Sequence, residues 1–445
     1  MTLTLKKYIA DYKAIISLGL PILVGQLGQI TVGFADNIMV GHYSTEALAS
    51  ASFVNNVFNV VIFCCMGFSY GITPLVGTLF GRGERQRIGS LMRNALTLNI
   101  IFTISVMTLM SVLYFNLHRL GQPGELMPLI RPYYCIYLCG MLPMCIFYVF
   151  AQWAYGIKNT AMPMWIILGA NLLNIAGDYV LIFGKFGLPE LGLAGAGIAT
   201  LASRIFNATV IVAVFCLSAR YKPYRQGMAA ARCSLVKLRE VWRTSIPVAM
   251  QMTFESGSFT FAAIMAGWIG TISLAAFQVI VIISTLGFCL YCAIGAAISV
   301  LVANEAGSGS RSGMRRVAWA GYHVILAVAT CSSLFFVFGA RTVIGIFTDD
   351  PAVAALTLTL IFPLALYQYG DATQITFANA LRGTSNVMPM LWIAAVCYVV
   401  VGIPATYLLG FPAGMGTYGI ILSFSVSLFL AGGLFLYYFL RTTRK

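Results

Sequence analysis

The chain has 445 residues, of which 60% are hydrophobic and only 9% are charged, and its mean hydropathy is +0.88. Because soluble domains carry about 25% charged residues, this composition excludes a water-soluble globule and predicts an integral membrane protein. The net charge of +14 does not indicate nucleic-acid binding, since the basic residues fall in short gaps between apolar runs and not along one helix face.

The apolar runs predict twelve transmembrane helices, each of which needs roughly 20 apolar residues. In chain order they lie near residues 14–40, 47–78, 90–115, 128–155, 161–184, 192–218, 243–267, 272–304, 316–340, 353–381, 389–410 and 416–440. The first run is long and continues into this multi-span pattern, which is not typical of a cleaved signal peptide. We therefore expect an all-α integral membrane fold.

The basic residues predict the orientation of these helices. With an even number of spans, both termini lie on one side of the membrane. If that side is the cytoplasm, 22 of the 27 Lys and Arg residues fall in cytoplasmic segments. Only Arg119, Arg131, Lys185 and Arg341 fall outside, and Arg204 lies within a span. The excess of basic residues on the cytoplasmic side predicts a multi-pass protein of the cytoplasmic (inner) membrane with both termini in the cytoplasm.

The two halves of the chain repeat at one constant offset, the one that separates Pro21 from Pro247. The same shift superposes Gly81-x-Gly83-x-Arg85 on Gly307-x-Gly309-x-Arg311, and Met162-Pro163-Met164 on Met388-Pro389-Met390. Six helices per repeat give two lobes of the same orientation, related by a pseudo-two-fold axis along the membrane normal, which suits alternating access.

We assign residues 1–217 to an N-terminal six-helix lobe, 218–243 to a basic cytoplasmic linker and 244–445 to a C-terminal six-helix lobe. The basic residues of the linker fit a solvated connector, with binding to anionic lipid as the alternative.

Four of the thirteen acidic residues lie well inside the predicted spans: Asp36, Asp178, Glu255 and Asp371. A charge at the centre of a membrane helix costs about 2.5–3.5 kcal/mol on insertion scales, and such residues face a protein interior or a water-filled cavity. A helical rise of about 1.5 Å per residue places one pair in the outer half of the first lobe and the other near mid-bilayer in the second. We expect both pairs to mark a transport pathway; a structural polar network that specifies helix packing is the alternative.

Polar neighbours accompany both pairs. Asn174 precedes Asp178 by one helical turn, and Tyr367 precedes Asp371 in the same way. Carboxylate and amide oxygens suit hard cations such as Na⁺, and two close carboxylates can also share a proton. Both Na⁺ and H⁺ are therefore candidates for a coupling ion.

Several strings of residues accompany the twelve spans and the repeat. They are Pro21 followed by Gly33-Phe34-Ala35-Asp36-Asn37-Ile38-Met39-Val40-Gly41, Asn174-x-x-x-Asp178-Tyr179, Gly192-x-x-Gly195-Ala196-Gly197-x-Ala199-Thr200, Phe254-Glu255 and Tyr367-x-x-x-Asp371. With these features the chain resembles, over essentially its whole length, the multidrug and toxic compound extrusion family, most closely its NorM branch. The resemblance implies a secondary active antiporter that exports amphiphilic, mostly cationic organic compounds in exchange for inward Na⁺ or H⁺.

The resemblance also implies which residues act. A cation or proton site in the first lobe corresponds to Asp36, Asn174, Asp178 and Thr200, and a second-lobe cation site to Glu255, Tyr367 and Asp371. Na⁺ is expected at Asp36, Asn174 and Asp178 or at Glu255 and Asp371. For the wall of a substrate cavity between the lobes we name Tyr148, Gln152, Phe254, Gln278 and Tyr369. The expected partners are small organic cations, the coupling ion and the lipid bilayer, and the expected state is a monomer.

Other functions fit less well. The nearest alternative is a flippase for lipid-linked saccharides from the same superfamily, whose cavity would bind pyrophosphate through Arg or Lys, whereas carboxylates repel phosphate. An enzyme is not expected, because the three His are scattered and no catalytic motif occurs. The eleven Cys show no metal or redox spacing, so no cofactor is expected. A channel is disfavoured, because lobed repeats with buried acids suit alternating access better than a filter.

Overall fold

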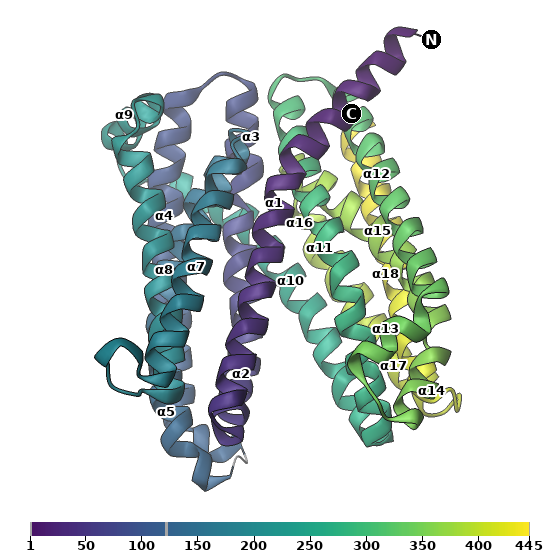
Figure 1. Cartoon of the computed structure of the whole chain (residues 1–445). Coiled ribbons are helices and arrows are strands. Elements are labelled where there is room, and N and C mark those ends of the chain that lie inside the picture. Colours follow the sequence, from purple (N-terminus) through teal and green to yellow (C-terminus); the bar gives the residue numbers. More distant parts are fainter. Residues whose placement is uncertain (1, 121–122, 445) are drawn as a thin grey trace. The chain divides into compact units, whose positions relative to one another are not determined.

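A computed structural model describes residues 2–120 and 123–444, and all regular secondary structure within these ranges is helical (Figure 1). The long segments are α1 (Thr2–Tyr43), α2 and α3 (Thr45–Tyr70 and Ile72–Gly81), α4 (Arg85–Phe115), α5 and α6 (Met127–Cys139 and Met141–Gly156), α7 (Ala161–Phe183), α8 (Gly192–Leu217), α10 (Leu235–Ile269), α11 (Thr271–Gly307), α12 (Arg311–Phe338), α14 and α15 (Pro351–Thr359 and Ile361–Gly383), α16, η5 and α17 (Met388–Ala394, Ala395–Gly402 and Ile403–Gly410) and α18 (Gly416–Arg444). Shorter helices lie in the connections: η1 (Leu117–Leu120), η2 (Gly124–Leu126), η3 (Lys185–Gly187), η4 (Ala219–Tyr221), α9 (Lys222–Ala230) and α13 (Ala340–Phe347).

Each of the twelve predicted helices has a counterpart, and the predicted all-α membrane fold is confirmed. Within the described ranges, ten helical segments are long and apolar enough to cross a membrane, and the pair α14–α15, bent by 48°, is an eleventh. The remaining counterpart is α10, which has 35 residues. Polar residues such as Gln251 and Glu255 make it less apolar than the others. Helices suit this composition because a bilayer offers no water to pair with exposed backbone groups.

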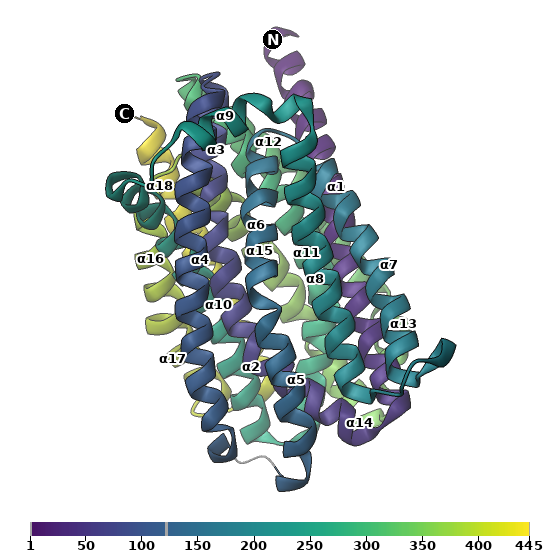
Figure 2. The same ribbon diagram turned by 90° about the vertical axis from the view of Figure 1, so that its left-hand side faces the viewer.

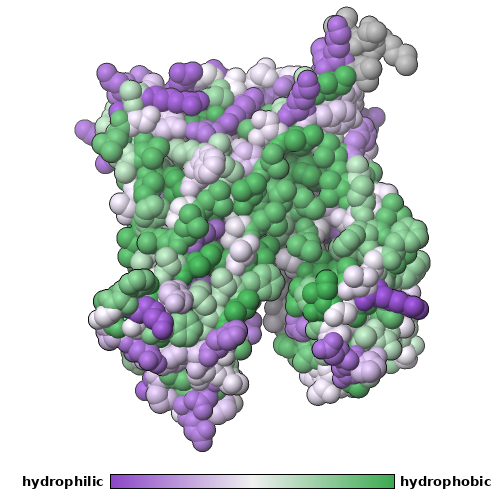
Figure 3. Space-filling model, viewed as in Figure 1, coloured by the Kyte–Doolittle hydropathy of each residue, from purple (hydrophilic) through white to green (hydrophobic). Residues whose placement is uncertain are grey.

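The side surface of the molecule has the character of a lipid-facing wall. Leu109, Leu172 and Trp392 are each more than 60% exposed. On the face seen in Figure 3, hydrophobic residues cover most of the middle of the surface, and hydrophilic residues gather toward the top and the bottom of the view. Exposed apolar area on this scale marks an interaction surface, and with ten or eleven apolar spans it identifies a multi-pass membrane protein.

Contacts divide the chain into two compact units. Residues 24–249 form one, called here the first unit, and residues 250–445 together with the segment up to Leu23 form the other, called the second unit. Both α1 and α10 therefore change unit partway along their length, α1 after Leu23 and α10 after Ala249. These two positions are equivalent in the sequence repeat, because Leu23 superposes on Ala249 when Pro21 superposes on Pro247.

The segment predicted as a basic linker belongs by its contacts to the first unit. There α9 packs against α4, and α6 packs on both α4 and α8, so that α4, α6 and α8 lie side by side (Figure 2). Trp153 of α6 is fully buried and its ring contacts Phe215, Tyr221 and Tyr224. The two predicted lobes, with borders at residues 217 and 243, were defined as parts that act together in transport. These borders stay a prediction.

The backbone displays the repeat directly. Gly83 and Gly309, which are equivalent in the sequence repeat, have φ angles of +77° and +76°, a conformation that glycine adopts without steric cost. The N–H of Gly83 donates to the carbonyl of Phe80, and the N–H of Gly309 donates to that of Ala306. The same tight turn therefore ends the second span of each repeat.

Candidate functional site

The first predicted acid pair meets inside the first unit. Asp36 lies on the part of α1 that belongs to this unit, and Asp178 lies on α7, more than a turn before that helix ends at Phe183. The two carboxyl groups are in hydrogen-bonding contact. Because an ionised carboxylate only accepts hydrogen bonds, this contact requires a proton on one partner or a cation between them.

Asn174 joins the pair to α8. In the amide orientation that satisfies both of its polar atoms, Asn174 Nδ2 donates to Asp36 Oδ1 at 3.0 Å. Its Oδ1 then accepts from the backbone N–H of Thr200 at 3.2 Å. The structure therefore brings all four predicted residues of this site together, from three helices.

Asp178 is the most deeply placed member of the group. Its side chain is fully buried, and neither of its oxygens receives a hydrogen bond from an N–H or hydroxyl group of the described residues. A buried charge without a partner costs several kcal/mol in proteins. The site therefore fits an exchangeable positive partner, either a proton or a small cation.

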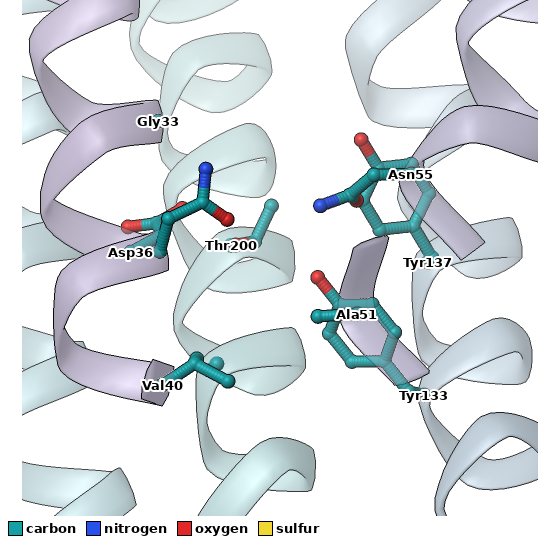
Figure 4. A pocket seen from close by; sticks show the side chains of 10 residues that line it. Gly33, Asp36, Val40, Ala51, Asn55, Tyr133, Tyr137 and Thr200 are labelled. Atoms are coloured by element: carbon teal, nitrogen blue, oxygen red, sulfur yellow. The ribbon is translucent and has the colours of Figure 1, made fainter. Parts of the chain in front are cut away.

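A cavity of about 160 Å³ opens beside Asp36 (Figure 4). Its lining residues are Gly33, Asp36, Asn37, Val40, Ala51, Asn55, Tyr133, Tyr137, Ala196 and Thr200. Figure 4 shows Asp36 and Thr200 on one side, facing Asn55 and Tyr137 on the other. A water needs roughly 10–15 Å³ of such space, whereas drug-sized ligands occupy pockets of about 300–1,000 Å³. The cavity is thus of a size for a hydrated ion.

The sequence reasoning did not name four polar residues of this cavity as site residues: Asn37, Asn55, Tyr133 and Tyr137. Asn55 comes from α2, and the two tyrosines come from α5. The adjacent Asn55 and Asn56 within an apolar run were a signal, since polar side chains inside spans are expensive and mark functional sites. The tyrosines gave none, because aromatic residues are common throughout this chain.

The second predicted acid pair lies in the second unit and has a different environment. Glu255 Oε2 accepts from Gln251 Nε2 at 2.7 Å and from Gln374 Nε2 at 3.4 Å. Asp371 is 1% exposed, interacts with Glu255 through charge, and has one oxygen, Oδ2, without a hydrogen-bond donor among the described residues. Glu255 is therefore held by amide side chains, whereas Asp371 keeps one buried oxygen without a donor.

Tyr367, the third predicted residue of this site, is buried one turn before Asp371. Its ring contacts Phe259 and Phe424, with centroids 6.4 and 6.3 Å away. All three line a pocket of about 10 Å³, which is room for one water at most. Glu255 and Asp371 are not among the residues that line this pocket.

The five predicted wall residues occupy varied places. They are Tyr148 and Gln152 in the first unit, and Phe254, Gln278 and Tyr369 in the second. Gln152 Oε1 accepts from Thr73 Oγ1 at 2.6 Å, and Tyr369 donates to Thr330 Oγ1 at 3.4 Å. Tyr148 and Phe254 are half-buried, and Gln278 is exposed. None of them lines either pocket described above, and their role in binding cargo stays a prediction.

The chain matches known proteins along nearly its full length. The MatE family model matches residues 21–180 and 247–408, two copies that begin at the equivalent prolines of the sequence repeat. The probable multidrug resistance protein NorM of Bradyrhizobium diazoefficiens is 29% identical over 450 residues, covering 99% of this chain and 96% of that protein. The multidrug resistance protein MdtK of Pectobacterium atrosepticum is 29% identical over 410 residues, covering 91% and 89%.

Solved structures share the fold. A transporter of the MOP superfamily from Pyrococcus furiosus superposes with a TM-score of 0.89 at 18% identity, covering 98% of this chain and 97% of that one. A mutant of the Vibrio cholerae MATE transporter VcmN gives 0.88 at 16% identity, covering 99% and 98%. Since the MatE model covers most of both repeats, this chain belongs to the MatE family, whose members are membrane transporters and not enzymes.

Proposed function

We propose that this protein is a secondary active antiporter that exports amphiphilic, mostly cationic organic compounds in exchange for inward movement of Na⁺ or H⁺. The class of cargo is supported by relatives that are named multidrug resistance proteins. Cation coupling rests on one observation, the contact between the half-buried carboxyl group of Asp36 and the buried one of Asp178 beside a cavity of ionic size. We further propose a monomer of the bacterial inner membrane with both termini in the cytoplasm, as the basic residues predict.

The cation would act as a switch on the position of α1. When a proton or Na⁺ occupies the site, Asp36 and Asp178 can stay in contact, with Asn174 holding both Asp36 and α8. When the cation leaves, two adjacent carboxylates repel each other, and α1 is driven away from α7. A cation can shift such an equilibrium only by the difference in its affinity for the two states.

The course of α1 would carry this switch to the rest of the molecule. The segment of α1 up to Leu23 packs in the second unit, while Asp36 lies in the first. Within the second unit, Arg316 of α12 donates to Asp11 of this segment at 2.5 Å. A displacement of Asp36 is therefore transmitted along one continuous helix, which gives alternating access a mechanical link to the cation site.

Transport of ethidium, a lipophilic cation, by purified protein in liposomes tests the proposal. Wild-type efflux should require an inward Na⁺ or pH gradient, and imposing each gradient alone identifies the coupling ion. Asp36→Asn should abolish coupled efflux while leaving the amount of inserted protein unchanged. The exposed loop variant Asp349→Asn is the matched control and should transport normally. Efflux that persists after both gradients are collapsed would refute antiport, and normal efflux by Asp36→Asn would refute the assignment of the cation site to Asp36.

A further inference from the structure

Arg204 is a charged residue within a membrane span that the proposed mechanism does not yet use. It lies on α8, one helical turn after Thr200 of the cation site. Its guanidinium carbon is 4.2 Å from the centre of the Tyr137 ring, and its Nη1 donates to the Tyr137 carbonyl at 3.4 Å. Tyr137 also lines the cavity beside Asp36. The guanidinium thus has a defined position next to the cation site, against the ring and the carbonyl of Tyr137, which is called its seat below.

The break between α5 and α6 leaves room for this seat. Gly140 separates the two helices, and a Cβ atom at this position would lie 2.8 Å from Arg204 Nη1. That separation is shorter than an ordinary contact, so any larger residue at 140 would displace the guanidinium. Stacking of Arg on an aromatic face is attractive, most strongly where the pair is desolvated. Arg204 is therefore held in place without a carboxylate in direct contact.

The charges around the acid pair can be counted. Arg204 forms no ion pair with a carboxylate among the described residues, where the ion pairs are Arg87 with Glu84 and Arg316 with Asp11. It acts on Asp36 through space. The other polar groups around Asp36 are Asp178 and Asn174 from α7, Asn37 from α1, Asn55 from α2, Tyr133 and Tyr137 from α5, and Thr200 from α8. Of these only Asp178 can carry a charge at neutral pH.

We propose that Arg204 is the fixed counter-charge of the Asp36–Asp178 site, which lowers the affinity of the site for cations and limits it to one monovalent cation per transport cycle. This inference rests on the proposed antiport function. Two carboxylates and one guanidinium leave a net charge of −1, which a single H⁺ or Na⁺ neutralises. A second cation, or a divalent one, would leave uncompensated positive charge in surroundings of low dielectric constant, which is costly.

The size of the effect on affinity follows from Coulomb's law. Two unit charges about 10 Å apart in surroundings with an effective dielectric constant of about 20 change each other's binding equilibria roughly tenfold. Removing the Arg204 charge should therefore tighten cation binding about tenfold. A lower affinity favours release of the cation. In each transport cycle Na⁺ or H⁺ would have to leave the site toward the cytoplasm.

The test compares Arg204→Gln with Arg204→Lys, which keeps the charge. The measured quantity is the concentration of the driving cation that gives half-maximal ethidium efflux from liposomes, together with the number of cations moved per ethidium. Arg204→Gln should lower that concentration about tenfold, and Arg204→Lys should stay within about threefold of the wild type. An unchanged value in an inserted Arg204→Gln protein overturns the proposal.

A second variant pair covers the case in which Arg204→Gln does not fold. Gly140→Ala pushes the guanidinium out of its seat and keeps its charge, and the exposed neighbour Cys139→Ala is the matched control. Gly140→Ala should change the half-saturating cation concentration at least threefold, and no change overturns the proposal. Two further measurements separate the two hypotheses. Wild-type efflux that needs neither gradient would overturn the antiport proposal itself. If Asp36→Asn still couples efflux to the cation, the acid pair is not the coupling site and the role of Arg204 fails with it, whereas loss of coupling in Asp36→Asn with an unaltered Arg204→Gln removes only the role of Arg204.

Discussion

Each of the two units holds one buried and one half-buried acid inside its helices, and the two pairs have contrasting surroundings. In the first unit, Asp36 and Asp178 contact each other beside a cavity of about 160 Å³, and Asp178 has no hydrogen-bond donor among the described residues. In the second unit, Glu255 already accepts hydrogen bonds from two glutamine side chains. A carboxylate that is satisfied by fixed amide donors has less need of an exchangeable cation. The comparison favours the first unit as the site that couples transport and the second as a polar network.

The proposed difference between the two units can be tested by removing one carboxylate from each unit. Asp178→Asn leaves Asp36 without the partner that makes the site attractive to a cation, and we expect cation-driven ethidium efflux to fall by about 100-fold, a loss within the range for residues that bind the driving species. Glu255→Gln keeps an oxygen that can accept from Gln251, and we expect a loss below about tenfold. The measurement is the initial efflux rate per inserted protein. Equal losses in both variants would contradict the distinction between the units.

The acid sites show how far the sequence can predict function. Asp36 and Asp178 were identified because charges inside apolar runs are costly, and Asn174 because it precedes Asp178 by one helical turn; the structure brings the three together. Asn55 and the seat of Arg204 could not be placed, because the face that α2 or α8 turns toward α1 depends on packing between distant segments. The apolar runs carry no information on that rotation, since their hydrophobic residues surround each helix almost uniformly.

The features of the fold likewise divide into those that the sequence predicts and those that it does not. The long apolar helices follow from composition, because a bilayer forces such runs into helices. The breaks at Gly71 and Gly140 were not predicted, since apolar residues continue on both sides of each glycine. Nor could the sequence predict that α1 and α10 change unit after Leu23 and Ala249. The repeat marked these positions as equivalent but did not reveal what each half of the helix packs against.

The parts of α1 and α10 that precede the change of unit at Leu23 and Ala249 provide a second comparison. A Cβ atom at Gly71 would lie 2.5 Å from Ser245 Cα of α10, whereas the repeat has Ala297, a larger residue, in the position of Gly71. We expect Gly71→Ala to destabilise the protein by about 1–3 kcal/mol, because the added Cβ would overlap with the backbone of Ser245, which cannot yield as a flexible side chain can. Gly19→Ala, whose nearest atom is 3.4 Å away, is the matched control and should stay near wild type. Thermal unfolding in detergent measures both variants, and an unaltered melting temperature for Gly71→Ala would show that the helices separate easily.

The smallest expected effect concerns the polar contacts that hold these same halves. Asp11 accepts from Arg316 at 2.5 Å with both side chains largely buried, and at the equivalent place in the repeat Lys237 donates to Ser90 at 2.6 Å on the surface. Losing one partner of a buried pair leaves the other charge uncompensated, whereas exposed contacts contribute about 0–1 kcal/mol. We expect Asp11→Ala to cost about 1–2 kcal/mol in thermal unfolding and Lys237→Ala less than about 0.5 kcal/mol. Equal losses of stability in the two variants would mean that the charge of Asp11 does not stabilise the packing of α1. In that case apolar packing alone would hold this half of the helix in the second unit.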